Sequence, residues 1–231
     1  MKKFFLSSYT LGLFRECPRC FWFHMVRGYN FERPQPPTST LPSGMDNLIK
    51  KYFDRYRKEN LLPPEISNTL KGRLVEEEII QKWRNWKTGL EFVDNDGSKF
   101  IGALDDCLVF EEAYIPLDYK TRGHELKENS HTYYILQMSC YNFLLAKNGY
   151  KVSNLAYLIF YIPTGLESNG LVRFDVKIKK VETFSLEKTY GIFSDALSVL
   201  ASGEPPSQSE SCKFCDWAEK TCQKQTQLKL F

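Results

Sequence analysis

The sequence predicts an α/β fold in which helices flank a mixed central sheet, with a small cysteine-bearing appendage beside it. Three observations support this prediction. The spacing of apolar residues changes from helical to alternating and back again along the chain. Of the 231 residues, 42% are hydrophobic and 15% are aromatic, which is enough to bury a sizeable core. Five of the seven cysteines lie near the two ends of the chain.

The first part of the chain is expected to be mainly helical. Residues 6–27 have helical spacing, and Ser7 or Ser8 can cap the first helix. Residues 30–43 contain four prolines and predict an irregular connection. Residues 44–59 predict an amphipathic helix, because their apolar side chains recur at helical spacing between charged ones.

The remainder of the chain predicts strands interrupted by helices. The expected elements are strands at 90–93, 100–110 and 114–119, a helix at 131–147, strands at 155–162 and 171–178, and a helix at 186–201 capped by Ser185. Turn signals occur at Asp94-Asn95-Asp96-Gly97 and at Pro163-Thr164-Gly165. Strands that alternate with helices in this way are typical of an α/β domain with a mixed sheet.

We expect a single domain over residues 1–231, with a helical region at 1–60, a core at 90–180 and a cysteine-rich tail at 204–231. The net charge is only +3, but it is unevenly distributed. Residues 1–60 carry eleven Lys/Arg and five Asp/Glu, whereas residues 91–129 carry four and ten. This separation suits an enzyme that holds a polyanion near carboxylate-bound metal; ordinary solvated surface charge is the alternative explanation.

The sequence predicts a cytoplasmic protein that does not bind a membrane. No apolar run approaches the ~18–20 residues that a transmembrane helix needs. The N-terminus begins like a signal peptide, but Ser7, Ser8 and Tyr9 break the apolar stretch, and Arg15-Glu16 follows where a cleavage site would lie. A cytoplasmic chain keeps its thiols reduced, and seven cysteines do not make an even disulfide framework.

Two acidic residues and a lysine are candidates for chemistry. Asp105 and Asp118 lie on or at the ends of neighbouring predicted strands, so their carboxylates can approach each other. Two such oxygen donors and a backbone carbonyl suit Mg²⁺ or Mn²⁺. Asp118 and Lys120 are two residues apart and project to one face of a strand. The lysine could orient or deprotonate water, or neutralise a phosphate, as the hydrolysis of a phosphodiester requires.

The helix that follows adds a second pair of polar residues. Gln137 and Tyr141 are four residues apart and therefore lie on one helix face. They could donate hydrogen bonds to a substrate backbone or to other groups of the site. An ordinary amphipathic helix with Tyr141 half buried is the alternative.

Three short motifs occur in a fixed order, namely Gly102-x-x-Asp105, Asp118-x-Lys120 and Gln137-x-x-x-Tyr141. Together they resemble the RecB-like branch of the PD-(D/E)XK nuclease superfamily. Two terminal segments extend the resemblance over nearly the whole chain. Leu6-Ser7-Ser8 with Cys17-Pro18-Arg19 is similar to the N-terminal motif of that branch. Cys212-x2-Cys215-x6-Cys222 is similar to the tail of its iron–sulfur members, which include CRISPR-associated RecB-like exonucleases and AddB-type helicase–nuclease subunits.

The resemblance implies a restriction-endonuclease-like sheet and a role for each motif residue. Asp105 and Asp118 would bind metal together with the Tyr119 carbonyl, and Lys120 would be the catalytic lysine. Gln137 and Tyr141 would support the DNA and the geometry of the active site.

One metal ligand of the family is missing from its usual place. Many members carry a histidine after a glycine in an early helix, but Gly44-Met45-Asp46-Asn47-Leu48 contains none. Gly72-Arg73-Leu74-Val75-Glu76 has the matching spacing, with Glu76 at the histidine position. Either Glu76 replaces the histidine as a metal ligand, or the ligand is absent.

The terminal cysteines allow two interpretations. Cys17, Cys20, Cys212 and Cys215 have the spacing of a tetrahedral zinc site, which leaves Cys222 over. Alternatively, Cys17, Cys212, Cys215 and Cys222 hold a [4Fe–4S] cluster, which leaves Cys20 over. The family resemblance favours the cluster. In both cases the metal would be structural and would join the two ends of the chain.

The resemblance implies a metal-dependent DNA nuclease, an exonuclease acting on single-stranded ends in DNA repair or CRISPR adaptation. Integrase-type or helicase proteins are the expected partners. Basic residues near the N-terminus could guide the DNA, namely Arg15, Arg19, Arg27, Lys50 and Lys51. The alternative is a non-catalytic DNA-binding or assembly subunit that uses the nuclease fold as a scaffold.

Overall fold

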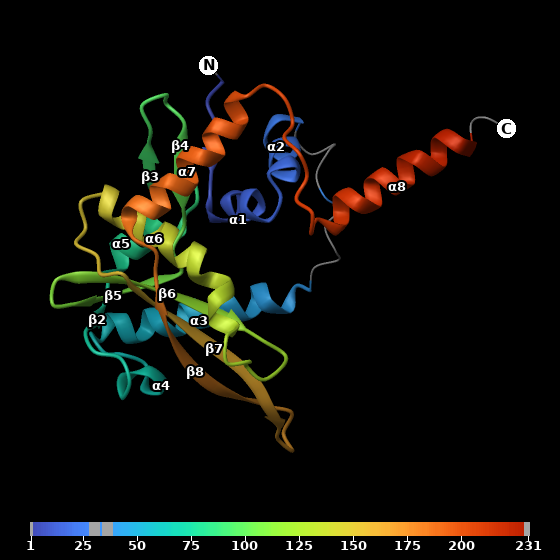
Figure 1. The fold of residues 1–231 in the computed structure, drawn as a ribbon. Coiled ribbons are helices and arrows are strands. Elements are labelled where there is room, and N and C mark those ends of the chain that lie inside the picture. Colours follow the sequence, from blue (N-terminus) through green and yellow to red (C-terminus); the bar gives the residue numbers. More distant parts are fainter. Residues whose placement is uncertain (1, 28–32, 34–38, 229–231) are drawn as a thin grey trace.

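The computed structural model describes residues 2–27, 33 and 39–228, with the helical backbone alone described for 222–228. Its elements are, in chain order, β1 (Phe5–Leu6), α1 (Ser8–Glu16), α2 (Pro18–Arg27), α3 (Leu41–Lys58), α4 (Pro64–Ser67), β2 (Arg73–Leu74), α5 (Glu77–Arg84), β3 (Leu90–Val93), β4 (Lys99–Gly102), β5 (Asp106–Phe110), β6 (Ala113–Thr121), the 3₁₀ helix η2 (Ser130–Tyr134), α6 (Ile135–Lys147), β7 (Leu155–Leu166), β8 (Val172–Glu182), α7 (Leu186–Ala201) and α8 (Lys213–Leu228). Figure 1 shows how they are arranged. None of the described helices is both long enough and apolar enough to cross a membrane.

A five-stranded mixed sheet forms the centre of the fold, which confirms the predicted α/β class. Its strand order is β2-β5-β6-β7-β8, and only β6 and β7 are parallel. The α6 helix makes the crossover that a parallel pair requires. One apolar cluster joins β7 to α6 and α7, and a second joins β6 and β7 to α3. Helices therefore cover both faces of the sheet.

Alternate residues of β6 face opposite sides of this sheet. Ile115, Leu117 and Tyr119 belong to the apolar cluster that α3 covers. Asp118 and Lys120 point the other way, and both contact a side chain of α6. The period-2 alternation of β6 thus places a buried acid and a lysine on the face that α6 covers.

The predicted strand at 100–110 is in fact two strands that belong to different sheets. β4 ends at Gly102 and pairs with β1 and β3 in a three-stranded sheet, whereas β5 begins at Asp106 in the larger sheet. A Cβ at Gly102 would lie 2.6 Å from Leu144 Cδ1, so glycine lets α6 approach the strand closely. Asp105 lies in the break between the two strands.

The N-terminal segment is helical only from Ser8 onward, so the expected helical range 6–27 begins too early. Phe5–Leu6 form β1, which runs parallel to β4. Ser7 caps α1 in a capping box, because its side chain accepts from the Thr10 amide while the Thr10 side chain accepts from the Ser7 amide. A two-residue strand carries no periodicity of its own, which is why the sequence did not indicate it.

The expected turn at Pro163-Thr164-Gly165 is wrong. β7 continues to Leu166, and its pairing with β8 shifts register between Pro163 and Gly165. Proline has no amide hydrogen to donate and is tolerated at such a bulge. The chain reverses instead at residues 167–170, where Gly170 has a φ of +81°.

The long helices were predicted well. α7 spans the predicted residues 186–201, and the Ser185 side chain accepts from the Lys188 amide as its cap. α3 begins a few residues before the predicted range 44–59, with a proline in its first turn. The start of the predicted helix 131–147 is the 3₁₀ turn η2. The short elements β2, α4 and α5, and the terminal helix α8, were not anticipated.

Candidate active site and cysteine cluster

Four of the predicted catalytic side chains form one hydrogen-bonded group between β6 and α6. Lys120 Nζ lies 2.5 Å from Asp118 Oδ2 and 3.4 Å from Gln137 Oε1, to which it donates. Gln137 Nε2 donates to Asp118 Oδ1 at 3.0 Å and to the Tyr141 hydroxyl at 2.8 Å. The single glutamine therefore fixes the orientations of the acid, the lysine and the tyrosine relative to one another.

Asp118 is a buried acid whose negative charge is only partly offset. Its residue is 1% exposed. Burial, followed by the charge of Asp105, raises the pKa of Asp118 to about 7, although Lys120 and Lys50 act in the opposite direction. Burial and the same two carboxylates raise the pKa of the Tyr141 hydroxyl well above its usual value, so this hydroxyl stays protonated. The site favours an additional positive charge.

Asp105 enters the site from the break between β4 and β5. Its Oδ1 lies 2.8 Å from Lys50 Nζ on α3, and its backbone carbonyl accepts from Arg84 Nε at 2.8 Å. Because the charge of Asp105 raises the pKa of Asp118, the two carboxylates act on each other. The structure thus brings both predicted metal-binding acids to one place.

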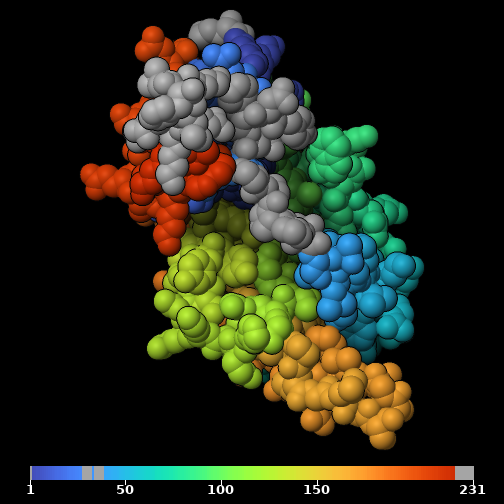
Figure 2. All heavy atoms as spheres, turned by 90° about the vertical axis from the view of Figure 1, so that its right-hand side faces the viewer, coloured from blue at the N-terminus to red at the C-terminus, as the bar shows by residue number. Residues whose placement is uncertain are grey.

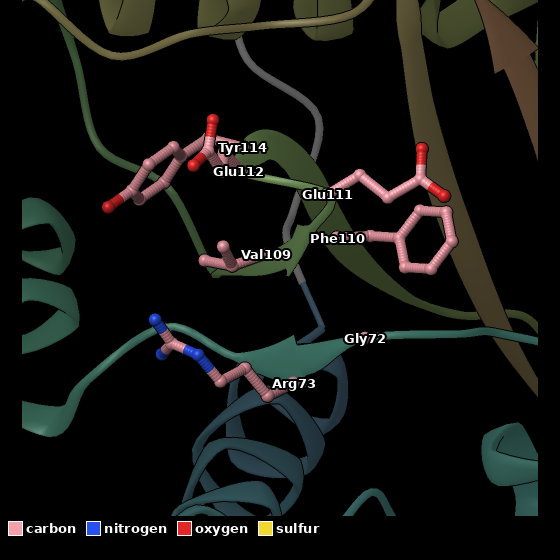
Figure 3. A pocket seen from close by; sticks show the side chains of 7 residues that line it. All are labelled: Gly72, Arg73, Val109, Phe110, Glu111, Glu112 and Tyr114. Carbon is pink, nitrogen blue, oxygen red and sulfur yellow. The ribbon is translucent and has the colours of Figure 1, made fainter.

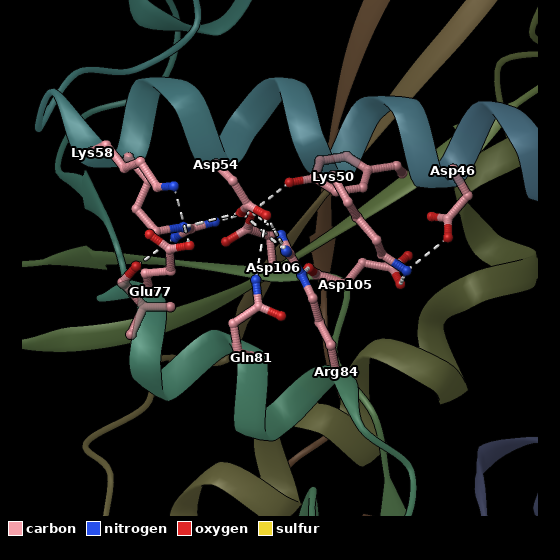
Figure 4. A network of polar contacts seen from close by, with 12 residues as sticks. Asp46, Lys50, Asp54, Lys58, Glu77, Gln81, Arg84, Asp105 and Asp106 are labelled. Carbon is pink, nitrogen blue, oxygen red and sulfur yellow. Dashed lines mark hydrogen bonds and ion pairs between the residues drawn. The ribbon is translucent and has the colours of Figure 1, made fainter.

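A buried network of ion pairs holds the chain where it passes from β4 to β5 (Figure 4). Asp106 is fully buried and accepts from Arg57 Nη2 at 2.5 Å, from Arg84 Nη2 at 3.2 Å and from the Tyr119 hydroxyl at 2.5 Å. Asp54 accepts from both guanidinium groups. Asp106 is therefore a structural neighbour of Asp105 that fixes the start of β5.

Two predicted ligands are less directly connected to the site. The Glu76 carboxylate pairs with Arg73 at 2.5 Å, and both side chains are about half exposed. No hydrogen bond or ion pair joins Glu76 to Asp105 or Asp118 among the described residues. The Tyr119 side chain points to the α3 side of the sheet, and a metal-binding role for its carbonyl stays a prediction.

The terminal cysteines form a compact cluster between α1–α2 and the start of α8. The Sγ atoms of Cys17 and Cys215 are 3.9 Å apart, and Cys20 Sγ lies 3.7 Å from Cys212 and 3.5 Å from Cys215. All four buried sulfurs lie within 4.8 Å of one another. The side chain of Cys222 lies outside the described residues, so its predicted role as a ligand stays a prediction.

The spacing of the four sulfurs is informative about what they can hold. Tetrahedral coordination with metal–sulfur bonds of about 2.3 Å places sulfur atoms roughly 3.8 Å apart. A [4Fe–4S] cluster puts iron and sulfide atoms between its thiolates and therefore spreads them farther apart. The four described thiols, as they are arranged, fit a single tetrahedral ion.

A nearby arginine places a positive charge beside the cysteine cluster. Arg33 Nη2 donates to Cys212 Sγ at 3.2 Å. Burial raises the pKa of Cys20 to about 11 even though Arg33 opposes this shift. Burial would also raise the pKa of Cys17, but hydrogen bonds with the backbone of Ser209 and of Cys20 lower it to about 6. A guanidinium at this position would offset the negative charge of metal-bound thiolates.

The basic residues expected to guide DNA have different environments. Lys50 is engaged by Asp105, and Arg19 forms a partly exposed ion pair with Glu219 at 3.2 Å. Lys51 is exposed on α3. Figure 2 shows the face on which α3 (light blue) lies beside the segment after β6 (yellow-green). In that segment Tyr133 is 78% exposed, and such a ring is available to stack on a base.

A pocket elsewhere on the molecule does not contribute to this site. It has a volume of about 550 Å³ and lies where β2 meets the β5–β6 hairpin (Figure 3). Its lining residues are Gly72, Arg73, Val109, Phe110, Glu111, Glu112 and Tyr114. None of them belongs to the group around Asp118, so this pocket lies outside the polar cluster.

Sequence motifs missed the partners that α3 and α5 provide. Lys50 pairs with Asp105 of the site. Two arginines pair with the supporting acids, Arg57 with Asp106 and Arg84 with Asp54. In the sequence, each of these basic residues looks like an ordinary helix surface residue. The available signal was an acid four residues before Lys50 and another three residues before Arg57, at helical spacing.

Comparisons with known proteins agree with the fold and match a nuclease superfamily. A family model described as the PD-(D/E)XK nuclease superfamily matches residues 41–223. The crystal structure of SSO0001 is similar in fold, with a TM-score of 0.52, 12% identity, and coverage of 94% of this chain and 86% of that chain. No match was found among curated proteins. Because the family model covers most of the chain, including the acids, lysine, glutamine and tyrosine described above, the chain belongs to the PD-(D/E)XK nuclease superfamily.

Proposed function

We propose that this protein is a metal-dependent deoxyribonuclease of the RecB-like branch, an exonuclease that hydrolyses phosphodiester bonds at single-stranded DNA ends. The observation that carries the proposal is the hydrogen-bonded group of Asp118, Lys120, Gln137 and Tyr141, with Asp105 beside it. Residues 1–231 would act as one nuclease domain with its core at 90–180.

The residues present fit a divalent cation. Asp118 Oδ2 is buried, and its partner is the positively charged Lys120 ammonium, 2.5 Å away. Asp105 and Asp118 would hold the cation, with the Tyr119 carbonyl as a further donor. When bound, Mg²⁺ or Mn²⁺ supplies polarisation of the scissile phosphate and activation of water.

The protein side chains supply orientation and proton transfer. Lys120 would orient the attacking water and stabilise charge on the phosphate, because its ammonium is held by Asp118 and by Gln137. The Tyr134 ring lies 4.8 Å from the same ammonium and limits its movement. Gln137 and Tyr141 would keep this geometry and contact the DNA backbone.

A second metal would be structural. The four described thiols favour one tetrahedral ion such as zinc at Cys17, Cys20, Cys212 and Cys215. The [4Fe–4S] alternative, which the family resemblance favours, uses Cys222 in place of Cys20. Either metal would join α1–α2 to α8. Roles in DNA repair or CRISPR adaptation, with integrase-type or helicase partners, belong to the same proposal and rest on the resemblance.

The test is cleavage of end-labelled linear single-stranded DNA and of circular single-stranded DNA, with Mg²⁺, Mn²⁺ or EDTA. We expect metal-dependent loss of the linear substrate only, and no cleavage by Asp118→Asn. Cleavage of the circular substrate would replace the exonuclease proposal with an endonuclease. No cleavage by folded, metal-replete wild type would favour the non-catalytic scaffold.

A further inference from the structure

A lysine ammonium lies between two carboxylates, one of which is the predicted metal ligand Asp105 (Figure 4). Lys50 Nζ is 2.7 Å from Asp46 Oδ2 and 2.8 Å from Asp105 Oδ1. The side chains of Lys50 and Asp105 are each 22% exposed, and that of Asp46 is 33% exposed. Two acids from different parts of the fold, one on α3 and one in the β4–β5 break, therefore converge on one cation.

A third acid is influenced by the same positive charge. Lys50 acts on the buried carboxylate of Asp118 as well as on Asp105. Asp118 is 1% exposed, and the partner of its Oδ2 is the Lys120 ammonium, 2.5 Å away. Asp118 therefore depends, like Asp46 and Asp105, on a lysine ammonium to offset its negative charge.

We propose that Asp46 is a third carboxylate of the metal site, and that the Lys50 ammonium occupies the place of the metal's charge when no metal is bound. This inference rests on the proposed nuclease function. It assigns to Asp46 the ligand role for which the sequence had offered Glu76. A divalent cation at the three carboxylates would displace the ammonium, because both positive charges need the same oxygen atoms.

Asp46 is better placed than Glu76 to act as a metal ligand beside Asp105. Asp46 lies one turn before Lys50, on the helix that packs against β6. Its carboxylate is joined to Asp105 through a single ammonium. Glu76, in contrast, is at the start of α5 and pairs with Arg73. Displaced from the carboxylates, Lys50 would be free to contact a DNA phosphate beside the metal.

The test measures Mn²⁺ binding by calorimetry and by electron paramagnetic resonance, without DNA and without reference to activity. We expect Asp46→Asn to weaken Mn²⁺ binding by about tenfold or more, as loss of a metal-site partner does. Lys50→Met removes the competing charge and should strengthen binding several-fold. Lys51→Met, on the next and exposed position of α3, is the matched control and should not change the affinity. Circular dichroism of each variant confirms that it is folded.

The outcomes separate this inference from the proposed function. If wild type binds Mn²⁺ and Asp118→Asn abolishes binding while Asp46→Asn leaves it unchanged, the role of Asp46 is overturned and the nuclease proposal stands. If Glu76→Gln weakens binding and Asp46→Asn does not, Glu76 is the ligand. If Lys50→Met binds Mn²⁺ no more tightly than wild type does, the Lys50 ammonium does not compete with the metal. If wild type binds no Mn²⁺, both proposals fail.

Discussion

Asp118 shows how a single residue can be held in an unfavourable state by its surroundings. The carboxylate is buried beside Asp105, and the two lysines near it do not fully offset these effects, so its pKa is raised to about 7. Such a group binds a cation readily because the cation relieves both burial and repulsion. Without a cation, the same group lowers the stability of the fold.

The raised pKa of Asp118 predicts that metal-free protein becomes more stable when this residue is neutralised. The pKa of Asp118 is about 7 in the folded chain and near ~4 in the unfolded chain. The folded state therefore binds the Asp118 proton more tightly. Its contribution to stability is fully present below about pH 4 and is lost as pH rises through 7. In EDTA at pH 8, Asp118→Asn should therefore raise the free energy of unfolding, on the order of 2–4 kcal/mol. At pH 4 the two proteins should be equally stable. Thermal unfolding at both pH values checks this, and a lower stability of the variant at pH 8 would contradict it.

Sequence could identify some residues of the site and not others. Asp118 and Lys120 were expected on one face because strand geometry fixes their relation, and the structure brings them together. Gln137 and Tyr141 were found by helical spacing in the same way. Lys50 was expected only as a residue that guides DNA; its pairing with Asp105 could not be predicted, because Asp105 comes from a distant segment and only the packing of α3 joins them.

The break between β4 and β5 is the element on which the position of Asp105 depends. The chain leaves one sheet after Gly102 and joins another at Asp106. Arg84 holds the Asp105 carbonyl, while Arg57 and Arg84 hold the Asp106 carboxylate. A change of sheet depends on long-range pairing and leaves no signature in local periodicity; hence one continuous strand was expected at this point.

Removal of one buried arginine should loosen this element. Arg57 is 3% exposed in its side chain, and its loss leaves Asp106 with a weaker set of partners. We expect Arg57→Met to lower the free energy of unfolding by about 3–5 kcal/mol, because breaking a buried ion pair leaves an uncompensated charge. Lys58→Met provides the matched control, since its 3.6 Å pair with Glu77 is largely exposed and should be worth at most about 1 kcal/mol. Urea unfolding of both variants measures the difference, and equal effects would contradict the structural role of the network.

At the scale of the whole molecule, the four-cysteine cluster joins the two ends of the chain. Cys17 lies between α1 and α2 and Cys20 lies on α2, whereas Cys212 directly precedes α8 and Cys215 lies in its first turn. α8 itself extends away from the rest of the molecule (Figure 1). Without this junction, few described contacts would hold α8, among them the ion pair between Arg19 and Glu219. A metal in the cluster would therefore stabilise the association of the ends.

The identity of the ligands can be tested with two single substitutions. The spacing of the described sulfurs predicts that Cys20→Ser lowers the metal content and that Cys222→Ser retains it. The [4Fe–4S] alternative predicts the reverse pattern, with brown colour and absorbance near ~400 nm in anaerobically purified protein. Metal analysis and absorbance spectra of both variants decide between them. Full metal content in both variants would contradict both assignments.

The whole fold was predictable at the level of class and long elements. Continuous helices such as residues 186–201 carry enough periodicity to be located by spacing alone. The division of the strands between two sheets depends on long-range pairing, such as that of Phe5 with Lys99, which no local pattern encodes. The approach of the two cysteine pairs was anticipated from their ligand-like spacing, and the structure brings Cys17 and Cys20 together with Cys212 and Cys215.

The most direct test of the central claim is the cleavage rate of Lys120→Met on linear single-stranded DNA, compared with wild type at equal occupancy by Mn²⁺. Lys120 touches Asp118 and Gln137 but is not expected to bind the metal, so its loss should leave the protein folded and metal-bound. We predict a loss of activity of about 10²- to 10⁴-fold, the usual contribution of a positioned acid–base group. Undiminished cleavage by the metal-bound variant would contradict the assignment of this group as the hydrolytic site.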